Sequence, residues 1–363
     1  MRIFHIDSEM HWRGGEQQVA YLMAELAALG VENVVGCNRG SRLEHYCRLH
    51  EIPFRSLNFG GGQLRAAWQV RSHGRALGID LVHLHAAKAH SAGVFAHLLG
   101  LDAPLVLSRR TAFPVRRNPL SRFKYRYPGV RRILCVSATV KAIMDAVRPS
   151  STGNVVVHSG VDFARFDFEG HSQKDLRNTY HFPQDSILVG SVGALTIEKD
   201  HLTFIRTAQH LLAQDPRFRL LIIGQGPRLE ELKGQVVRRG IEDKVTFTGY
   251  LDHLEQYLPG LDYLLSTSVS EGFPGSLLEA MACRVPVVAT AAGGIPEMIQ
   301  HRRTGCLAPL GDHRRLAAEI IHLQQHPQVR EALTAQAYEM VATRFSKQVT
   351  ALKTYNIYRQ VLA

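Results

Sequence analysis

Residues 263–288 read YLLSTSVSEGFPGSLLEAMACRVPVV and form the most informative stretch of the chain. They predict a buried strand at Tyr263 to Leu265, a turn rich in glycine and proline, a helix that begins near Gly275, and a second strand at Val285 to Val288. A strand, a helix and a strand in this order connect parallel neighbours, which a tight turn cannot join. The stretch therefore predicts one unit of a parallel α/β sheet.

The same alternation of strand-like and helical patterns runs through most of the chain. The other expected strands lie at Arg2 to Ile6, Asn33 to Cys37, Pro53 to Leu57, Leu81 to Leu84, Leu105 to Ser108, Ile133 to Val136, Val155 to Val157, Ile187 to Val192, Arg219 to Ile223 and Val245 to Phe247. The apolar runs lapse between Phe163 and Gln184, which indicates a domain boundary. We expect two Rossmann-like doubly wound α/β domains facing across a cleft, residues 1–165 and 166–345, and a C-terminal helix at 346–363 that packs back on the first domain.

The composition indicates a globular protein of about two domains, with 363 residues, 45% hydrophobic and 21% charged. These values exclude disordered, collagen-like and disulfide-scaffold classes. No uncharged apolar stretch reaches the ~18 residues of a membrane-spanning helix, and the first residues lack the features of a signal peptide, so we expect a cytoplasmic protein. The five cysteines are an odd number without a CxxC pair, which indicates reduced thiols and no zinc site.

The net charge of +11 belongs entirely to the first half of the chain. Residues 1–165 hold 22 Lys and Arg against 11 Asp and Glu, whereas residues 166–363 hold 21 of each. One basic run without an acidic residue contains Arg109, Arg110, Arg116, Arg117, Arg122, Lys124, Arg126, Arg131 and Arg132. Such a run favours an anionic partner, and charge alone leaves open a lipid headgroup, a phosphorylated acceptor or nucleic acid.

Candidate site residues of the second half follow its strands, because open α/β sheets bind ligands at their carboxyl ends. In the turn after Ser266, Glu271 and Glu279 can accept hydrogen bonds from different hydroxyls of one ligand, and the helix start between them suits a phosphate. Lys199 follows the strand that ends at Val192 and can act as a point charge for a diphosphate.

The first half repeats this arrangement with glycine and histidine. Gly14 and Gly15 precede an expected helix, and His85 follows the strand at Leu81 to Leu84. His83 and His85 point the same way by the period of two. We expect them to form hydrogen bonds and not to bind a metal, because no third ligand of suitable spacing accompanies them.

Together these residues resemble the family-four retaining glycosyltransferases of the GT-B fold over nearly the whole chain. The strongest element is Glu271-Gly-Phe-Pro-Gly-Ser-Leu-Leu-Glu279, which matches the family's Glu-x7-Glu signature. Supporting elements are Gly14-Gly15-Glu16, Cys135-Val136-Ser137, His158-Ser-Gly-Val-Asp162, Val285-Pro-Val-Val, Gly293-Gly-Ile-Pro-Glu297 and Gly305. Two positions depart from the pattern: Ala194 stands where the family commonly has an arginine, and Arg284 where it has a glycine.

The resemblance implies that a sugar moves, with retention and without metal or other cofactor, from a nucleotide-diphospho-sugar such as a UDP-sugar or GDP-sugar. It implies catalytic roles for His85, Glu271 and Lys199. The implied donor contacts are Gly15, Gly193, Lys199, Arg228, Glu271, Gly272, Phe273, Pro274, Gly275, Ser276, Leu277 and Glu279, with Glu279 on the ribose and Arg228 replacing the missing arginine.

The basic residues Arg109, Arg110, Arg116, Arg117, Arg122, Lys124 and Arg126 would then face the acceptor or a membrane. The resemblance implies a glycan or anionic lipid-linked acceptor in lipopolysaccharide or other cell-surface polysaccharide synthesis, and peripheral contact with the inner face of the cytoplasmic membrane. No nucleic-acid partner is expected. Two alternatives stay open: a sugar-nucleotide epimerase or phosphorylase of the same fold, and a basic nucleic-acid-binding protein.

Overall fold

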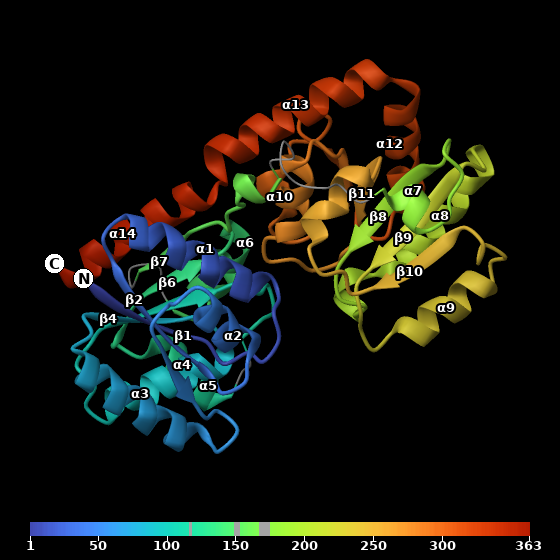
Figure 1. The fold of residues 1–363 in the computed structure, drawn as a ribbon. Coiled ribbons are helices and arrows are strands. Elements are labelled where there is room, and N and C mark those ends of the chain that lie inside the picture. Colours follow the sequence, from blue (N-terminus) through green and yellow to red (C-terminus); the bar gives the residue numbers. More distant parts are fainter. Residues whose placement is uncertain (116–117, 149–152, 167–174) are drawn as a thin grey trace. The chain divides into compact units, whose positions relative to one another are not determined.

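The structure, a computed structural model, describes residues 1–115, 118–148, 153–166 and 175–363. These residues form two compact units, and Figure 1 shows the course of the chain through them. The first unit consists of Met1–Gly160 and Lys347–Ala363, and the second of Val161–Ser346. Each unit holds one parallel sheet flanked by helices, which confirms the predicted fold class.

In the described part of the first unit, seven parallel strands form a sheet in the order β3-β2-β1-β4-β5-β6-β7. The strands are β1 (Arg2–Ile6), β2 (Glu32–Asn38), β3 (Phe54–Leu57), β4 (Leu81–Leu84), β5 (Leu105–Arg109), β6 (Val130–Cys135) and β7 (Asn154–Val156). The helices are α1 (Gly14–Ala28), α2 (Arg42–Leu49), α3 (Gln63–Leu77), α4 (Ala87–Leu98), α5 (Pro119–Arg126) and α6 (Ala138–Asp145). The strand order reverses between β1 and β4, which is where a doubly wound sheet binds its ligand.

The C-terminal helix α14 (Lys347–Leu362) completes the core of the first unit, as predicted, and lies along α1 in Figure 1. Its Tyr358 is fully buried in one cluster with Ile3 of β1 and Leu26 of α1. Lys347 Nζ lies 3.2 Å from Glu25 Oε1 of α1. Burying a large aromatic side chain stabilises by several kcal/mol, so α14 is an integral part of this unit.

In the described part of the second unit, six parallel strands follow the order β10-β9-β8-β11-β12-β13. They are β8 (Ile187–Val192), β9 (Phe218–Ile223), β10 (Val245–Gly249), β11 (Tyr263–Ser266), β12 (Val287–Thr290) and β13 (Cys306–Ala308). The helices are α7 (Leu176–Thr179), α8 (His201–Gln214), α9 (Leu229–Val237), α10 (Gly275–Ala282), α11 (Ile295–Met298), α12 (His313–Gln325) and α13 (Pro327–Arg344), with short 3-10 turns at η2 (Phe163–Phe166), η3 (Ile197–Lys199), η4 (Leu254–Gln256) and η5 (Leu258–Gly260).

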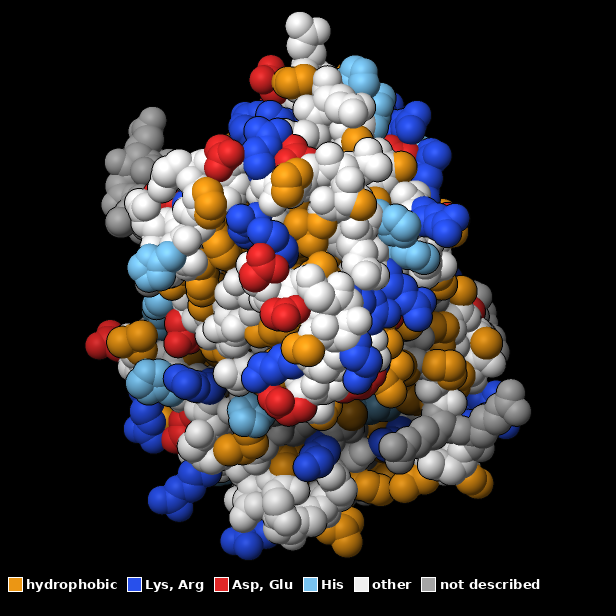
Figure 2. Space-filling model, turned by 90° about the vertical axis from the view of Figure 1, so that its right-hand side faces the viewer, with side chains coloured by type: hydrophobic (Ala, Val, Ile, Leu, Met, Phe, Trp, Pro, Cys, Tyr) orange, Lys and Arg blue, Asp and Glu red, His pale blue; other side chains and the backbone are white. Residues whose placement is uncertain are grey.

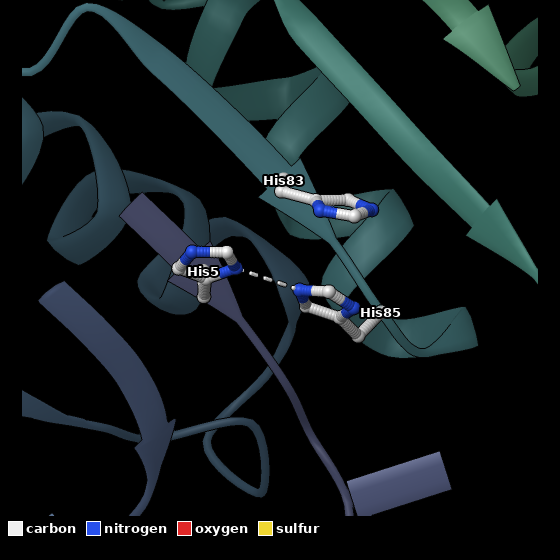
Figure 3. Close-up of side chains that lie close together, drawn as sticks. All are labelled: His5, His83 and His85. Carbon is white, nitrogen blue, oxygen red and sulfur yellow. Dashed lines mark hydrogen bonds between the residues drawn. The ribbon is translucent and has the colours of Figure 1, made fainter. Parts of the chain in front are cut away.

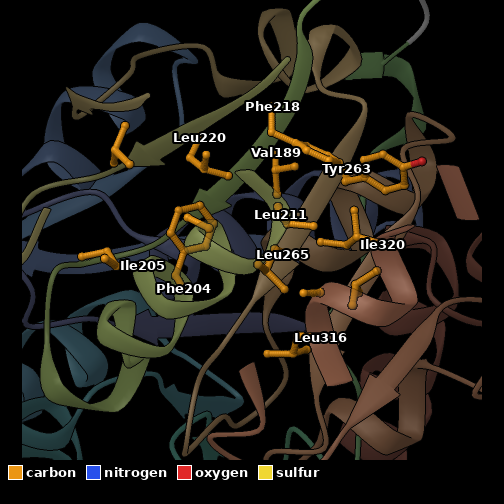
Figure 4. Close-up of a cluster of buried hydrophobic side chains, with 14 of the residues drawn as sticks. Val189, Phe204, Ile205, Leu211, Phe218, Leu220, Tyr263, Leu265, Leu316 and Ile320 are labelled. Atoms are coloured by element: carbon orange, nitrogen blue, oxygen red, sulfur yellow. The ribbon is translucent and has the colours of Figure 1, made fainter. Parts of the chain in front are cut away.

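Buried side chains of the second sheet and of helices α8 and α12 form its core (Figure 4). Val189, Phe204, Leu220 and Ile320 are fully buried there. Strands buried in this way read as continuous apolar runs, which is why the sequence revealed them. The three-residue strand β13 was not predicted, because Cys306–Ala308 contains no β-branched or aromatic residue.

Helix starts follow local sequence signals. The Ser137 side chain accepts a hydrogen bond from the Val140 N–H at the start of α6, and Asp200 and Asp312 cap α8 and α12 in the same way. Each cap satisfies a backbone donor that the helix cannot pair, and is worth about 1 kcal/mol. Within the described ranges, no helix combines the length and hydrophobicity needed to cross a bilayer.

Candidate active site

In the second unit, the loops after β8 and β11 bring Lys199 and Glu271 into contact. Lys199 Nζ lies 2.6 Å from Glu271 Oε1, and Ser268 Oγ donates a hydrogen bond to the same oxygen at 2.6 Å. The Val269 N–H donates to the Glu198 carbonyl at 2.8 Å, which ties the two loops together. A cation and a carboxylate predicted from separate motifs therefore meet at the carboxyl edge of this sheet.

Glycines hold these loops in place by backbone contact. Gly293 has φ +51°, and a Cβ at this residue would lie 1.9 Å from the Glu271 carbonyl oxygen. The Gly294 N–H donates to that carbonyl at 3.1 Å. A Cβ at Gly224 would lie 2.0 Å from the Gly193 carbonyl oxygen. Side chains at Gly224 and Gly293 would push the site loops apart, so glycine is required at both.

Helix α10 begins next to this contact with backbone donors that no side chain caps. Pro274 is its N-cap residue and provides no side-chain hydrogen bond, and a Cβ at Gly275 would meet nothing within 4 Å. Gly272, Phe273 and Leu277 are buried around this turn, and Ser276 is half-buried. The first N–H groups of a helix and the positive end of its dipole suit an anionic oxygen or a hydroxyl.

Glu279 lies one turn further along α10, beside an ion pair between Arg165 and Glu255. Arg165 Nη2 and Glu255 Oε2 are 2.6 Å apart. Burial raises the pKa of Glu279, the Arg165 charge lowers it, and the Glu255 charge raises it. The Glu279 carboxyl is thus partly shielded from water and lies near one cation, Arg165, and one carboxylate, Glu255.

The Arg228 side chain is already paired and is not available as a second cation beside Lys199. Its Nε and Nη2 atoms donate to the two Glu231 carboxylate oxygens at 2.8 and 2.6 Å. Burial, together with the charges of Lys199 and Arg228, lowers the pKa of His201 to about 4, so both cations lie near this histidine. Arg228 would have to leave Glu231 to replace the arginine missing at Ala194, and that role stays a prediction.

The first unit gathers charged groups at the carboxyl edge of its sheet, where β1, β4 and β5 end. Asp7, Glu16 and Arg110 interact electrostatically there, and His85 feels the Arg110 charge. Burial raises the pKa of Asp7 to about 6, and burial together with the Asp7 charge raises that of Glu16 to about 7. Gly15 lies beside Glu16 in the first turn of α1, and a Cβ there would meet nothing within 4 Å.

Three histidines meet behind this edge, as Figure 3 shows. His5 of β1 stands opposite His83 of β4, and its Nδ1 lies 3.0 Å from His85 Nε2. The expectation that His83 and His85 lack a third ligand is wrong: one nitrogen from each of the three rings lies within 4.8 Å of the others, a spacing that a metal ion could bridge. His5 was missed because it is 78 residues from His83 in sequence and reaches it only through the pairing of β1 with β4.

Several buried polar atoms near this edge have no hydrogen-bond partner in the described structure. They are Ser8 Oγ, His85 Nδ1, Arg109 Nε and Arg110 Nε. Buried polar groups are paired in the great majority of proteins, and each unpaired one costs about 1–3 kcal/mol. A bound polar molecule could form hydrogen bonds with these atoms, because they include both donors and acceptors.

A groove of about 860 Å³ opens over the carboxyl ends of β1, β2 and β3. Its polar lining includes Ser8, Asn38, Arg39, Arg65 and Lys88. Sequence reasoning missed this groove, because its residues come from six separate segments. Its volume is that of a small-molecule site, and its basic side chains, which outnumber the acidic Glu9 and Glu44, favour an anionic or hydroxyl-rich ligand.

The structure divides the basic run that the sequence predicts as one face. Arg109 Nη2 donates to the Phe113 carbonyl at 2.6 Å, Lys124 Nζ to Ser91 Oγ at 2.7 Å, and Arg126 Nε to the Val147 carbonyl at 2.7 Å. Arg110 lies with the Asp7 and Glu16 pair described above. Arg122 is exposed on α5, and Arg116 and Arg117 lie outside the described residues. The run is thus not a single solvated face.

Charges of both signs are interspersed elsewhere on the molecule. On the face in Figure 2, Lys and Arg side chains lie among Asp and Glu side chains. This agrees with the balanced count of residues 166–363, which hold 21 of each.

The fold and these sites define the class of the protein: an α/β protein with two parallel sheets, each with polar groups and glycine turns at its carboxyl edge. The family model for glycosyl transferases group 1 matches residues 172–340, and the model for glycosyltransferase family 4 matches residues 12–165. The two models together cover most of the chain, which therefore belongs to the group 1 and family 4 glycosyltransferases that they describe.

Individual relatives agree with this assignment. N-acetyl-alpha-D-glucosaminyl L-malate synthase of Bacillus anthracis is 37% identical over 144 residues, 40% of this chain, and an amylovoran biosynthesis glycosyltransferase of Erwinia amylovora is 31% identical over 202 residues, 53% of this chain. The matches span 38% and 47% of these two relatives, less than half of each. The crystal structure of Anabaena HepE with UDP and glucose superposes with a TM-score of 0.86 at 22% identity, over 99% of this chain and 100% of that one, and shows the shared fold.

Proposed function

We propose that the second unit binds a nucleotide-diphospho-sugar and that the enzyme transfers its sugar to an acceptor hydroxyl with retention of configuration. The contact between Lys199 and Glu271 carries this proposal. The two groups neutralise each other at a distance of 2.6 Å. A diphosphate attracts the ammonium, and sugar hydroxyls donate to the carboxylate, so one extended ligand with both groups can replace the pair.

The remaining donor contacts follow from the resemblance and from the open helix start. We assign the diphosphate to Lys199 and the first N–H groups of α10, the ribose to Glu279, and the donor sugar to Glu271. Gly15 in the first unit would approach the donor phosphate through its open backbone. Further contacts are assigned to Gly193, Arg228, Gly272, Phe273, Pro274, Gly275, Ser276 and Leu277.

The reaction breaks the bond between the anomeric carbon and a diphosphate oxygen, and forms a bond from that carbon to the acceptor oxygen. Its transition state is oxocarbenium-like, with negative charge growing on the departing diphosphate. Lys199 and the α10 N-terminus stabilise that charge electrostatically. The leaving phosphate takes the acceptor proton, since no carboxylate is assigned as a nucleophile. His85 acts beside the reacting carbon.

We propose that the acceptor is a glycan or anionic lipid-linked sugar of cell-surface polysaccharide or lipopolysaccharide synthesis. The name of the Erwinia relative, a biosynthetic glycosyltransferase of the polysaccharide amylovoran, supports this class. The groove over β1, β2 and β3 supports it too, because Arg39, Arg65 and Lys88 line it. This assignment moves the acceptor from the predicted Arg109–Arg126 run to the groove.

Helix α5 is the proposed point of peripheral contact with an anionic membrane. Leu120 and Phe123 are 56% and 45% exposed, and Arg122 and Arg126 are exposed on the same short helix. Exposed apolar groups among basic side chains are typical of segments that rest in the headgroup region. The double variant Leu120→Ser/Phe123→Ser should weaken sedimentation with phosphatidylglycerol vesicles, whereas Leu352→Ser on α14 should not. Equal sedimentation of both variants would refute the contact.

Donor binding is tested by the thermal stability of the full chain with UDP-, GDP-, ADP- and CDP-sugars. A ligand at 100 times its Kd stabilises by roughly 2.7 kcal/mol, which gives a clear shift in Tm. We expect one nucleotide family to raise Tm, and Lys199→Ala and Glu279→Ala to lose the shift. Lys233→Ala is the matched control, since Lys233 pairs with Glu230 on the exposed side of α9.

The stereochemistry is read from the anomeric proton of the product by NMR. Retention supports the proposal and inversion refutes it. If no nucleotide sugar stabilises the protein while RNA does, the nucleic-acid-binding alternative replaces the transferase proposal. Interconversion of sugar nucleotides without acceptor would favour the epimerase alternative.

A further inference from the structure

A buried chain of hydrogen bonds joins Asn33, His5 and His85 in the first unit. His5 Nε2 lies 3.0 Å from Asn33 Oδ1, and His5 Nδ1 lies 3.0 Å from His85 Nε2. Figure 3 shows the second of these bonds, between a ring on β1 and a ring just after β4. His5 is 0% exposed and His85 is 7% exposed, so water does not compete for these bonds.

The amide of Asn33 fixes the direction of the whole chain. Its nitrogen donates to the Met23 and Val31 carbonyls at 3.1 and 3.3 Å, so its Oδ1 faces His5 and can only accept. His5 Nε2 must therefore be protonated. Burial lowers the pKa of His5 to about 4, so His5 is neutral at pH 7 and its Nδ1 is an acceptor.

The hydrogen bond to His5 also fixes the tautomer of His85. Because His5 Nδ1 accepts, His85 Nε2 is protonated and donates. Burial, with the charges of His83, His5 and Arg110, lowers the pKa of His85, so this ring is neutral too. Its second nitrogen, Nδ1, then has a lone pair and no proton. That atom is buried and has no hydrogen-bond partner in the described structure.

We propose that Asn33 and His5 are positioning residues that hold His85 as the Nε2–H tautomer, so that its Nδ1 accepts a hydrogen bond from a hydroxyl of the substrate. A lone pair can receive a hydroxyl proton but repels a phosphate oxygen, so His85 distinguishes the two kinds of group. The hydroxyl role rests on the proposed function, whereas the tautomer follows from the hydrogen bonds alone.

A metal ion held by His5, His83 and His85 would exclude this arrangement. A metal bound at the facing nitrogens His5 Nδ1 and His85 Nε2 would need both of them without a proton, whereas the 3.0 Å bond between these two atoms needs a proton on one of them. His83 has separate partners, the Tyr358 hydroxyl and Ser108 Oγ. Its Nε2 lies 2.8 Å from Ser108 Oγ.

The tautomer is measured directly by long-range ¹H–¹⁵N NMR on the full chain labelled with ¹⁵N-histidine. His5→Gln and His85→Gln identify the two rings by loss of their signals. We expect the spectrum of the wild-type protein to show His85 protonated at Nε2 and not at Nδ1. The opposite tautomer, or one equivalent of tightly bound metal in the purified protein, overturns the proposal.

Asn33→Leu removes the acceptor that fixes the chain and keeps a similar volume. We expect it to populate the Nδ1–H form of His85 and to lower kcat about tenfold, the effect of one lost hydrogen bond, with the donor KM within about twofold. Tyr358→Phe is the matched control, because it removes a bond to His83 at the same depth without touching the Asn33–His5–His85 chain. It should leave the His85 signals and kcat unchanged.

The two proposals fail in different ways. If Asn33→Leu changes the His85 tautomer but not kcat, the hydroxyl role of Nδ1 is overturned while the tautomer assignment stands. If the wild-type protein transfers no sugar, the proposed function fails, and the NMR spectrum still tests the tautomer. The wild-type spectrum also decides the question if Asn33→Leu does not fold.

Discussion

Replacing Glu16 by glutamine should stabilise the first unit at high pH and leave it almost unchanged at pH 5. The Glu16 carboxyl is 3% exposed, and burial and the nearby Asp7 raise its pKa from 4.5 to about 7. Between pH 4.5 and about pH 7 the native protein keeps the Glu16 proton, whereas the unfolded chain loses it. The free energy of unfolding therefore falls as pH rises through this window.

The magnitude follows from the shift of the Glu16 pKa. One pKa unit is worth 1.36 kcal/mol, so a rise from 4.5 to about 7 costs the native state about 3 kcal/mol at pH 8. Glutamine has no charge to bury. Its carbonyl oxygen can still accept the hydrogen bond that the Arg13 N–H donates to Glu16 Oε2 at 2.7 Å. We therefore expect Glu16→Gln to gain up to about 3 kcal/mol at pH 8.

Urea unfolding followed by tryptophan fluorescence measures this effect in the relevant unit. The chain has two tryptophans, Trp12 and Trp68, and both belong to the first unit. The difference between variant and wild-type stability should grow from pH 5 to pH 8. Glu51→Gln is the matched control, because Glu51 is exposed in the same unit and contributes to the pKa of neither Asp7 nor Glu16. A constant difference for Glu16→Gln would refute the reasoning.

Three other substitutions test particular contacts. Gly293→Ala places a Cβ 1.9 Å from the Glu271 carbonyl oxygen, so urea unfolding should show a loss of more than about 2 kcal/mol in stability. Gly275→Ala, whose Cβ meets nothing within 4 Å, should show no loss. Equal stability of the two variants would contradict the backbone contact. Arg284 has φ +58° and its Cζ lies 4.1 Å from the Tyr338 ring centre, so Arg284→Ala should cost about 1 kcal/mol in thermal unfolding while Arg284→Gly, which relieves the left-handed backbone, should be nearly neutral. Arg65→Ala should raise the acceptor KM severalfold in a transfer assay without changing the donor Tm shift, and an unchanged acceptor KM would remove the groove from acceptor binding.

Local patterns predicted the elements that local sequence determines. Ile187–Val192 was predicted as a strand because a parallel strand covered on both faces is a continuous apolar run. Lys199 and Glu271 were both selected because each follows a strand, although their 2.6 Å contact was not foreseen.

Contacts that depend on strand order could not be predicted from the sequence. His5 meets His83 because β1 pairs with β4, and nothing within either strand specifies that pairing. Arg110 was grouped with its basic neighbours in sequence, whereas in the fold it lies with Asp7 and Glu16. Arg284 stands where the family has a glycine, and the structure shows why a glycine suits this position: the backbone is left-handed with φ +58°, and the Arg284 guanidinium lies over the Tyr338 ring.

Burial at the first sheet's carboxyl edge also sets how that edge can recognise an anion. The pKa of Asp7 is about 6 and that of Glu16 about 7, so both lose their protons as pH rises from 5 to 8. Arg110 keeps its positive charge in this range, and the new negative charges oppose it. A nucleotide-diphospho-sugar does not change its own charge there, so its affinity should fall with rising pH if it reaches this edge through Gly15. Calorimetric titration of wild type and Glu16→Gln tests this: the variant should lose part of the dependence, and a flat affinity in the wild-type protein would mean that the donor is held by the second unit alone.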